Sequence, residues 1–459
     1  MNKLFIWKLA TIFLVNAIIT VTSIYSAQVG LLLPMDAHEK GLTKTNVGTI
    51  CGFYDGTALI LGLLISKFTH LANWKTVFWV SSLFYSVAIA CFGVLTFIEE
   101  KWTYIVLSVI DQIVAGAASC CIQTVMLPLM FALFPKQRGN LSAAIQEAYE
   151  AGSILGSLIG GFLFNFGGYF VPFLMTGVCG IVVTILSAFF VLPHKIQHVN
   201  ETVQVNEETD LKEISSKKEK PNKLTIVGVI LSYQIQLATY PNVIVSMTLG
   251  LFRVFLTPML TEVVKVAEKK IWCFFVPAPA MALVLSPVVG ILITWKYKWT
   301  IFLLSPIVGS IGSFLFCIVT FNLFLDGTAA QLVMVAGDIR KAHRLVCFGF
   351  SFSASWVVSC VISDEIFEAF SPNDAKKEYR ILMSTWNSNI CYMGGRCIGN
   401  ALVGGVLFDL TGFKGVILIQ LFLYLSSVLA ALSTYYQFRK KTKASRVLVS
   451  VTPGGNTQL

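Results

Sequence analysis

Apolar runs of about 20 residues recur along the whole chain, and they constrain the fold more than any other feature of the sequence. A run of that length crosses the hydrocarbon core of a bilayer as an α-helix, which satisfies every backbone hydrogen bond internally. The sequence therefore predicts an all-α membrane protein with twelve transmembrane helices in two six-helix bundles. The expected spans are about 9–33, 45–66, 76–97, 103–133, 142–164, 168–192, 241–262, 271–294, 300–325, 345–368, 381–408 and 412–437.

The composition agrees with this class. Hydrophobic residues make up 56% of the chain and charged residues only 13%, with a mean hydropathy of +0.75, whereas a soluble domain carries about 25% charged residues. The net charge of +10 is spread over short clusters between the apolar runs, so no nucleic-acid-binding face is expected. The 11 cysteines follow no metal or disulfide spacing. No Cys/His, Ser/His or metal-spaced acid cluster appears, and we therefore expect neither an enzyme nor a cofactor.

A charged segment separates the two sets of apolar runs. Residues 194–223 are rich in Lys and Glu, poor in apolar residues and without a helical stripe, which is typical of a disordered linker. Residues 224–240 could span, but Pro241 and two glutamines favour an interfacial approach to the seventh helix. The expected organisation is therefore a first bundle at 1–193, a linker and interfacial segment at 194–240, a second bundle at 241–437 and a tail at 438–459.

The positive residues predict the orientation. If both termini are cytoplasmic, most of the 34 lysines and arginines fall in cytoplasmic loops and tails, among them Lys67, Lys75, Arg138 and the tail cluster FRKK. This asymmetry follows the positive-inside rule. The run from Leu9 to Leu33 is too long for a signal peptide and is interpreted as the first membrane helix. Either an endomembrane or the plasma membrane is compatible with this pattern.

A glycine-rich phrase occurs twice. GGFLFNFGGY begins at Gly160 and GGVLFDLTGF begins at Gly404, with five of ten positions identical. Each copy ends the fifth helix of its half and leads into the sixth. We expect the last glycine of each copy, Gly168 and Gly412, to permit the turn between the two helices. A parallel repeat of six helices is typical of major facilitator superfamily transporters, which the whole chain resembles.

Two further resemblances sharpen this interpretation. GSILGSLIGG (152–161) is similar to the antiporter motif in the fifth helix of that superfamily, with Ser157 in the place of a proline; Gly399 and Asn400 stand in the related place of the second half. The segments 134–173, 255–260, 364–370 and 384–413 resemble the vesicular amine transporter family, in particular its polyamine branch. This resemblance implies exchange of protons for a small organic cation, by a monomer embedded in the lipid bilayer.

The chain also departs from those patterns. The loop after Gly62 and the stretch after Gly290 lack the acidic residue of the superfamily's loop signature, Gln112 stands where an arginine is usual, and residues 9–33 contain no charge. These departures leave two alternatives to amine antiport. One is an orphan carrier of an anionic or zwitterionic metabolite with Arg396 as anchor, and the other is a transporter-like receptor that no longer moves solute.

Charged residues inside membrane helices are costly and need a partner or a function. Five of them form the expected substrate-binding or proton-coupling set: Asp55, Asp111, Glu147, Glu150 and Arg396. A buried carboxylate can take up and release a proton and attracts a cation, and Glu147 also matches a glutamate of the resembled branch. The alternative is that these acids form structural ion pairs with Arg253 or Arg396. Glu365, near a helix end, is interpreted as a structural latch or gate.

Small residues on the fifth and eleventh helices are expected to serve packing. Gly152, Gly156 and Gly160 recur once per turn on one side of the fifth helix, where they let another helix approach closely. Glu147 and Glu150 project from roughly the opposite side. The same packing function is expected for the other glycines of the two phrases: Gly161, Gly399, Gly404 and Gly405.

Overall fold

The computed structural model describes residues 3–68, 74–133, 138–190, 233–263, 267, 270–292, 297, 299–311 and 377–451. Their regular structure is entirely helical. Seven helical stretches within them are long and apolar enough to cross a membrane, and one of these, Asn387–Lys440, covers the positions of both the eleventh and twelfth expected helices. The chain is thus a multi-pass helical membrane protein. The linker at 194–223, the expected helix at 345–368 and Glu365 lie outside the described residues.

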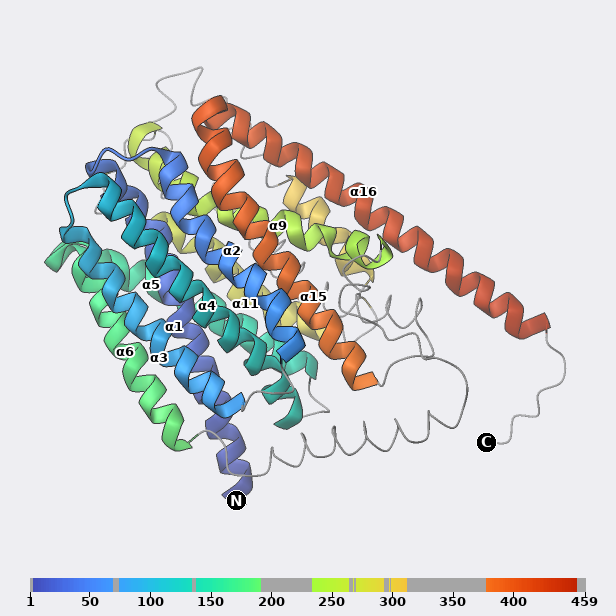
Figure 1. Ribbon diagram of the computed structural model, residues 1–459. Helices are drawn as coiled ribbons and strands as arrows, with labels where there is room; N and C mark the ends of the chain where they lie inside the picture. Colours follow the sequence, from blue (N-terminus) through green and yellow to red (C-terminus); the bar gives the residue numbers. More distant parts are fainter. Residues whose placement is uncertain are drawn as a thin grey trace.

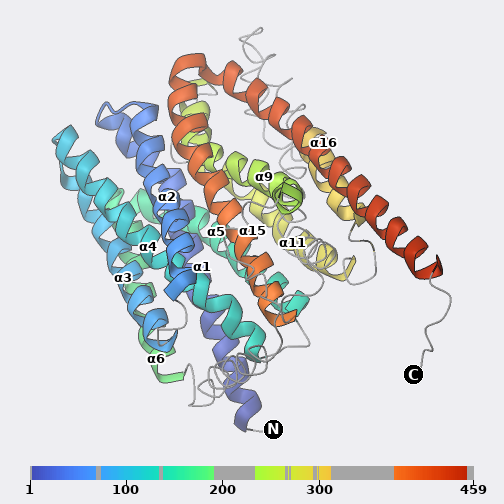
Figure 2. The same cartoon turned by 45° about the vertical axis from the view of Figure 1, so that its right-hand side comes forward.

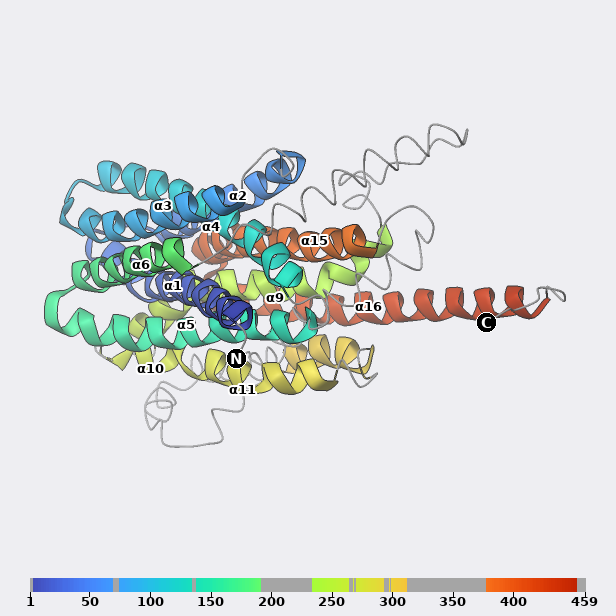
Figure 3. The same cartoon turned by 90° about the horizontal axis from the view of Figure 1, so that it is seen from below.

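The first half contains all six helices expected before residue 194. They are α1 (Lys3–Glu39), α2 (Lys44–Phe68), α3 (Trp74–Val94), α4 (Lys101–Leu133), α5 (Arg138–Gly167) and α6 (Phe170–Phe190). Helix α1 packs along α5 and α6, while α3 packs against α4 and α6. Figure 3 shows α3 and α6 on the side of this half that is remote from α16. Large side chains on the outside, such as Phe13 and Phe189, are more than 70% exposed, as a lipid-facing surface requires.

The second half is described in part. It contains α9 (Tyr233–Pro258) with a π-helical end η3 (Met259–Val263), the short α10 (Trp272–Phe275), α11 (Pro277–Leu292) and a helix at Trp299–Ile311. It ends with α15 (Lys377–Ile398), the π-helix η6 (Gly399–Leu407) and α16 (Phe408–Val451). Helix α9 begins at Tyr233 instead of 241 and includes Pro241. The proline is tolerated because neighbouring helices can satisfy the backbone groups that it frees.

Helices α2 and α15 lie side by side where the two halves meet (Figures 1 and 2). Helix α2 also contacts η6, and α1 contacts α9. On the other side of α1, helix α5 packs against α10 and α11. These contacts bring segments more than 300 residues apart in the chain into one interface.

Aromatic rings fill the interior of each half. In the first half the ring of Tyr25 meets Tyr85 edge-on with 5.8 Å between centroids, and Phe92 and Phe173 lie 5.9 and 6.1 Å away. All four side chains are buried. Such edge-to-face pairs stabilise a core beyond the area that they bury.

The last glycine of each repeated phrase turns the chain as expected. Gly168 has φ +62° and Gly412 has φ +66°, both in the left-handed region. No atom lies within 4 Å of the position that a Cβ would occupy at either residue. The backbone conformation, and not a lack of space, therefore requires glycine at both turns.

This gives a matched prediction for the two copies. Gly168→Ala and Gly412→Ala should each destabilise the folded protein by about 1–2 kcal/mol, because an L-residue is strained at positive φ. Asparagine, which tolerates this region better, should cost less at either position. Thermal unfolding of the purified variants measures the difference. Equal stability of the alanine variants and the wild type would contradict this explanation of the repeat.

Candidate functional site

The glycine stripe of α5 packs on α1. A Cβ at Gly152 would lie 2.5 Å from the carbonyl oxygen of Thr20, and one at Gly156 would lie 2.6 Å from that of Ile24. At Gly160 the nearest atom is Cγ of Gln28, at 3.1 Å. Only glycine allows the two backbones to approach this closely.

The second half repeats this contact between its own helices. Gly395, Gly399 and Gly404 face α9, where a Cβ would meet Val243, Met247 and Val254. The last step of this stripe is five residues long, where the first half has four, because η6 is π-helical and carries one extra residue per turn. Sequence inspection did not single out Gly395, since the shift in spacing hides its equivalence to Gly152.

The second glycine of each phrase contacts the opposite half. A Cβ at Gly161 would lie 2.5 Å from the indole of Trp272 in α10, and one at Gly405 would lie 3.3 Å from Cα of Thr45 in α2. In each phrase, the first glycine therefore packs against a helix of the same half, and the second glycine packs against a helix of the other half.

Polar contacts also join the two halves at the end of the interface where α1 connects to α2, which we term the α1–α2 end. The Lys44 ammonium lies 2.8 Å from the Glu262 carboxylate. The backbone N–H of Thr45 donates to Oδ2 of Asp409 at 2.9 Å, and its hydroxyl donates to the same oxygen. Asp409 belongs to the second glycine-rich phrase, and its carboxylate caps the first turn of α2 in the other half, where the helix dipole favours negative charge.

Further along α2, the side chain of Asp55 meets three polar side chains of the second half. We term these four residues the interface charge cluster: Asp55, Arg253, Arg396 and Asn400. Asp55 is 0% exposed. Its Oδ1 lies 3.3 Å from Nε of Arg396 and its Oδ2 lies 3.8 Å from Nη1 of Arg253. The Asn400 amide nitrogen donates to Oδ2 at 2.7 Å. Asp55 comes from the first half and the other three residues come from the second, so the cluster bridges the two halves.

The sequence placed Asp55 and Arg396 in the substrate or proton set, with ion pairing as the alternative. The structure pairs them with each other and with Arg253. A carboxylate buried at this depth is stabilised by its two guanidinium partners and its hydrogen bond. Asn400 was singled out only as a motif position; its neighbour in space, Asp55, could not be inferred from its place in the chain.

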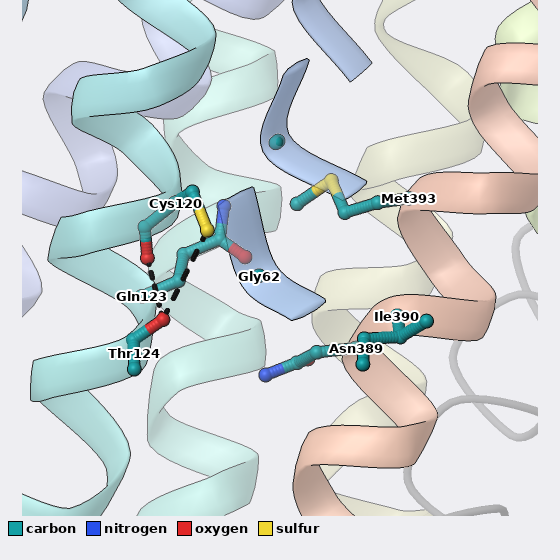
Figure 4. A pocket seen from close by; sticks show the side chains of 8 residues that line it. Gly62, Cys120, Gln123, Thr124, Asn389, Ile390 and Met393 are labelled. Carbon is teal, nitrogen blue, oxygen red and sulfur yellow. Dashed lines mark hydrogen bonds between the residues drawn. The ribbon is translucent and has the colours of Figure 1, made fainter. Parts of the chain in front are cut away.

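A narrow crevice lies beside the cluster, between α2, α4 and α15 (Figure 4). Ala58 and Met393 in its wall are one helical turn from Asp55 and Arg396. The crevice has a volume of about 20 Å³, room for about one water molecule. The remaining lining residues are Gly62, Cys120, Gln123, Thr124, Asn389 and Ile390.

The α5 glutamates differ from Asp55 in their surroundings. Glu150 is only 4% exposed, and its carboxylate accepts a hydrogen bond of 2.6 Å from the Gln146 side chain. Glu147, one turn earlier, is half-buried. Neither makes an ion pair with the part of the chain that the structure describes. At 100° per residue, Gly161 lies within about 20° of Glu150 on the helix surface, so Glu150 is on the side of α5 that carries the Trp272 contact.

Asp111 lies in a separate network within the first half. The Tyr25 hydroxyl donates to its Oδ2 at 3.4 Å, and the Gln112 side chain donates to the Tyr25 hydroxyl at 2.5 Å. No cationic side chain accompanies Asp111 within the described ranges. Gln112 stands where the superfamily usually has an arginine, so this carboxylate is left with neutral partners.

In the residues that the structure describes, no group of three or more His, Cys, Asp or Glu side chains could hold a metal ion. Among the described residues, the buried charges are Asp55 and Arg396 in the ion-paired cluster, Glu150 with a neutral partner, and Asp36 near the end of α1, which pairs with Lys40.

Comparison with known proteins identifies the architecture. The sequence profile of the Major Facilitator Superfamily matches residues 9–370. The chain is also 25% identical over 166 residues to the MFS-type transporter SLC18B1 of Homo sapiens, and 26% identical over 169 residues to that of Mus musculus. Each alignment covers 36–37% of this chain and 36% of the relative. The six helices of the first half, the internal repeat and the profile match together show that the chain belongs to the Major Facilitator Superfamily.

Proposed function

We propose that this protein is a secondary active transporter that exchanges protons for a small organic cation, such as an amine or polyamine, by alternating access. The observation that carries the proposal is Glu150, a carboxylate that is 4% exposed and accepts a hydrogen bond only from Gln146 among the described residues. A buried carboxylate without a cationic side chain is stable when it is protonated or when it holds a bound cation. Those two states are the ones that proton–cation exchange requires.

The position of Glu150 supports this function. It lies on the face of α5 that carries the contact of Gly161 with Trp272 in the second half. Transporters of this architecture bind their substrates between the two repeats, near the middle of the bilayer. Glu147 precedes Glu150 by one turn and is half-buried, so it can attract a cation to the same side of the helix. Asp111 provides a further carboxylate without a cationic partner in the described part of the chain.

The interface contacts support alternating access. Lys44 with Glu262 and Thr45 with Asp409 close the α1–α2 end between the halves. Each contact joins one half to the other, so rocking of the two bundles would break them together. The lysine and arginine distribution supports cytoplasmic termini, in an endomembrane or the plasma membrane, and the resemblance supports a monomer.

Glu150→Gln tests the proposal. The variant should fold, because the new amide has the same shape and its oxygen can still accept from Gln146. In proteoliposomes, accumulation of a radiolabelled diamine driven by a pH gradient should fall to the level of protein-free liposomes, since an amide cannot exchange a proton. Glu147→Gln should slow the same accumulation. Glu99→Gln, which removes an exposed carboxylate outside the spans, is the matched control and should behave as the wild type.

Two results would contradict the proposal. One is pH-driven accumulation by Glu150→Gln at the wild-type rate. The other is wild-type protein that binds diamines but never accumulates them under a pH gradient, which would favour a transporter-like receptor.

A further inference from the structure

The interface charge cluster holds more positive than negative charge. It contains the guanidinium groups of Arg253 and Arg396 and one carboxylate, that of Asp55. The side chains of Arg253 and Arg396 are only 12% and 8% exposed, so water screens the excess charge poorly. An uncompensated charge in such a site is strongly destabilising. The cluster therefore lacks one negative charge within the described residues.

The unused hydrogen-bonding groups of the cluster show where that charge belongs. Nη2 of Arg396 is buried and has no hydrogen-bond partner in the described part of the chain. Its Nε lies 3.3 Å from Asp55 without the alignment of a hydrogen bond, and its Nη1 reaches the Tyr392 hydroxyl only at 3.4 Å. The forked donor set of this guanidinium, which suits a planar carboxylate, is thus largely unsatisfied.

Asn400 contributes an acceptor at the same place. Its amide nitrogen donates to Asp55 at 2.7 Å, which fixes the orientation of the amide. The remaining oxygen is buried and has no donor among the described residues. Oδ1 of Asp55 is a second buried acceptor without a hydrogen-bond partner in the described part of the chain. Unsatisfied donors and acceptors so close together are rare in a folded interior, and they fit a ligand with a carboxylate beside an N–H group.

The cluster lies where a transported ligand would pass. It joins α2 of the first half to α9, α15 and η6 of the second, and the crevice of about 20 Å³ adjoins it. The crevice is too small for an organic molecule in this state. Separation of the two halves would expose Arg396 and Asn400 to the space between them.

We propose that the interface charge cluster is a carboxylate-binding subsite, in which Arg396 holds the carboxylate of a small amine-bearing substrate. The inference rests on the proposed transport function and narrows its substrate class to organic cations with a carboxylate, such as the cationic amino acids lysine and ornithine. Two guanidinium groups against one carboxylate leave one positive charge, which a single carboxylate neutralises and a doubly charged phosphate would exceed.

Pairs of ligands that differ by one carboxylate test the subsite. Ornithine is putrescine with an added carboxylate, and lysine is cadaverine with an added carboxylate. Each pair therefore has the same two amino groups and differs only in that carboxylate. Titrations of the purified full-length protein should show that each amino acid binds about tenfold or more tightly than its diamine, as expected for a charge-assisted hydrogen-bonded pair. Arg396→Gln should abolish this difference. Asp55 keeps Arg253 and Asn400 as partners in that variant, so it should still fold.

Arg439→Gln is the matched control, because Arg439 is exposed at the end of the apolar stretch Asn387–Lys440. This variant should leave the difference in affinity unchanged. Arg396→Lys keeps the charge without the forked donors and provides a second variant if Arg396→Gln fails to fold; it should reduce the difference.

Equal or tighter binding of the diamines by the wild type would overturn the inference, as would no binding of any of the four ligands. A carboxylate preference that survives Arg396→Gln would also overturn it. The two proposals fail separately. Diamine accumulation that is driven by pH and depends on Glu150, without a preference for the carboxylate, would overturn the subsite and leave the transport function standing.

Discussion

Replacement of Asp55 by alanine is expected to destabilise the folded protein by about 3–5 kcal/mol, the cost of leaving a buried partner charge uncompensated. Asp55 is 0% exposed and is the shared partner of Arg253 and Arg396. Its removal leaves two guanidinium groups together between the halves with no described carboxylate near them. The thermal midpoint and the yield of monodisperse protein in detergent measure the effect.

Two further variants test whether the unpaired buried charge causes the loss of stability. In Asp55→Ala/Arg396→Met one of the two unpaired charges is also removed, and we expect this double variant to recover part of the lost stability. Asp409→Ala removes a carboxylate that is also hydrogen-bonded between the halves but is exposed, so it should cost much less. An Asp55→Ala protein as stable as the wild type would show that the cluster does not hold the two halves together.

A second large effect on stability is expected when a single methyl group is added to α15. Gly395→Ala should destabilise the protein by about 1–3 kcal/mol, the usual cost of overpacking a close contact. A Cβ there would clash with the carbonyl oxygen of Val243 and would lie 2.9 Å from Cβ of Ser246. Backbone atoms of α9 cannot move aside without separating the two helices. Thermal unfolding of the purified variant measures the loss.

The neighbouring residue supplies the control. A Cβ at Gly394 would find its nearest atoms in the Leu59 side chain, at 3.8 Å, which is ordinary van der Waals contact. Gly394→Ala should therefore leave stability unchanged or raise it slightly, since alanine favours the helix over glycine. Similar losses in the two variants would mean that helix propensity, and not the approach of α9, decides the effect.

Several features were accessible from the sequence. The apolar runs predicted the positions of the six helices of the first half, because a membrane span needs about 20 predominantly apolar residues. The repeated phrases predicted the two turns, because the left-handed backbone at Gly168 and Gly412 is tolerated mainly by glycine. These are local properties, in which a residue and its near neighbours determine the outcome.

Other expectations depended on contacts across the molecule. The sequence offered two alternatives for Asp55 and Arg396, and it could not show that Nε of Arg396 lies 3.3 Å from the Asp55 carboxylate. The same sequence reasoning grouped Glu147 and Glu150 with Asp55, yet the α5 acids make no such pair within the described residues. A charge inside a span shows that a partner or ligand is needed, but it does not show which one.

The helix boundaries of the second half show the same limit. Pro241 and the polar residues before it predicted that the seventh helix begins at 241, whereas α9 begins at Tyr233. The π-helical turn of η6 shifts the glycine stripe by one residue. Neither feature can be recognised from local propensity, because packing against neighbouring helices stabilises both.

The sequence by itself determined the membrane class, the repeated plan and the glycines at the two turns. Tertiary structure alone decided which buried charges meet: Asp55 finds two arginines from the other half, while Glu150 is left with Gln146. The physical reason is that hydropathy and backbone conformation act over a few residues, whereas an ion pair requires two side chains within about 4 Å. Only the packing of helices distant in sequence sets that separation.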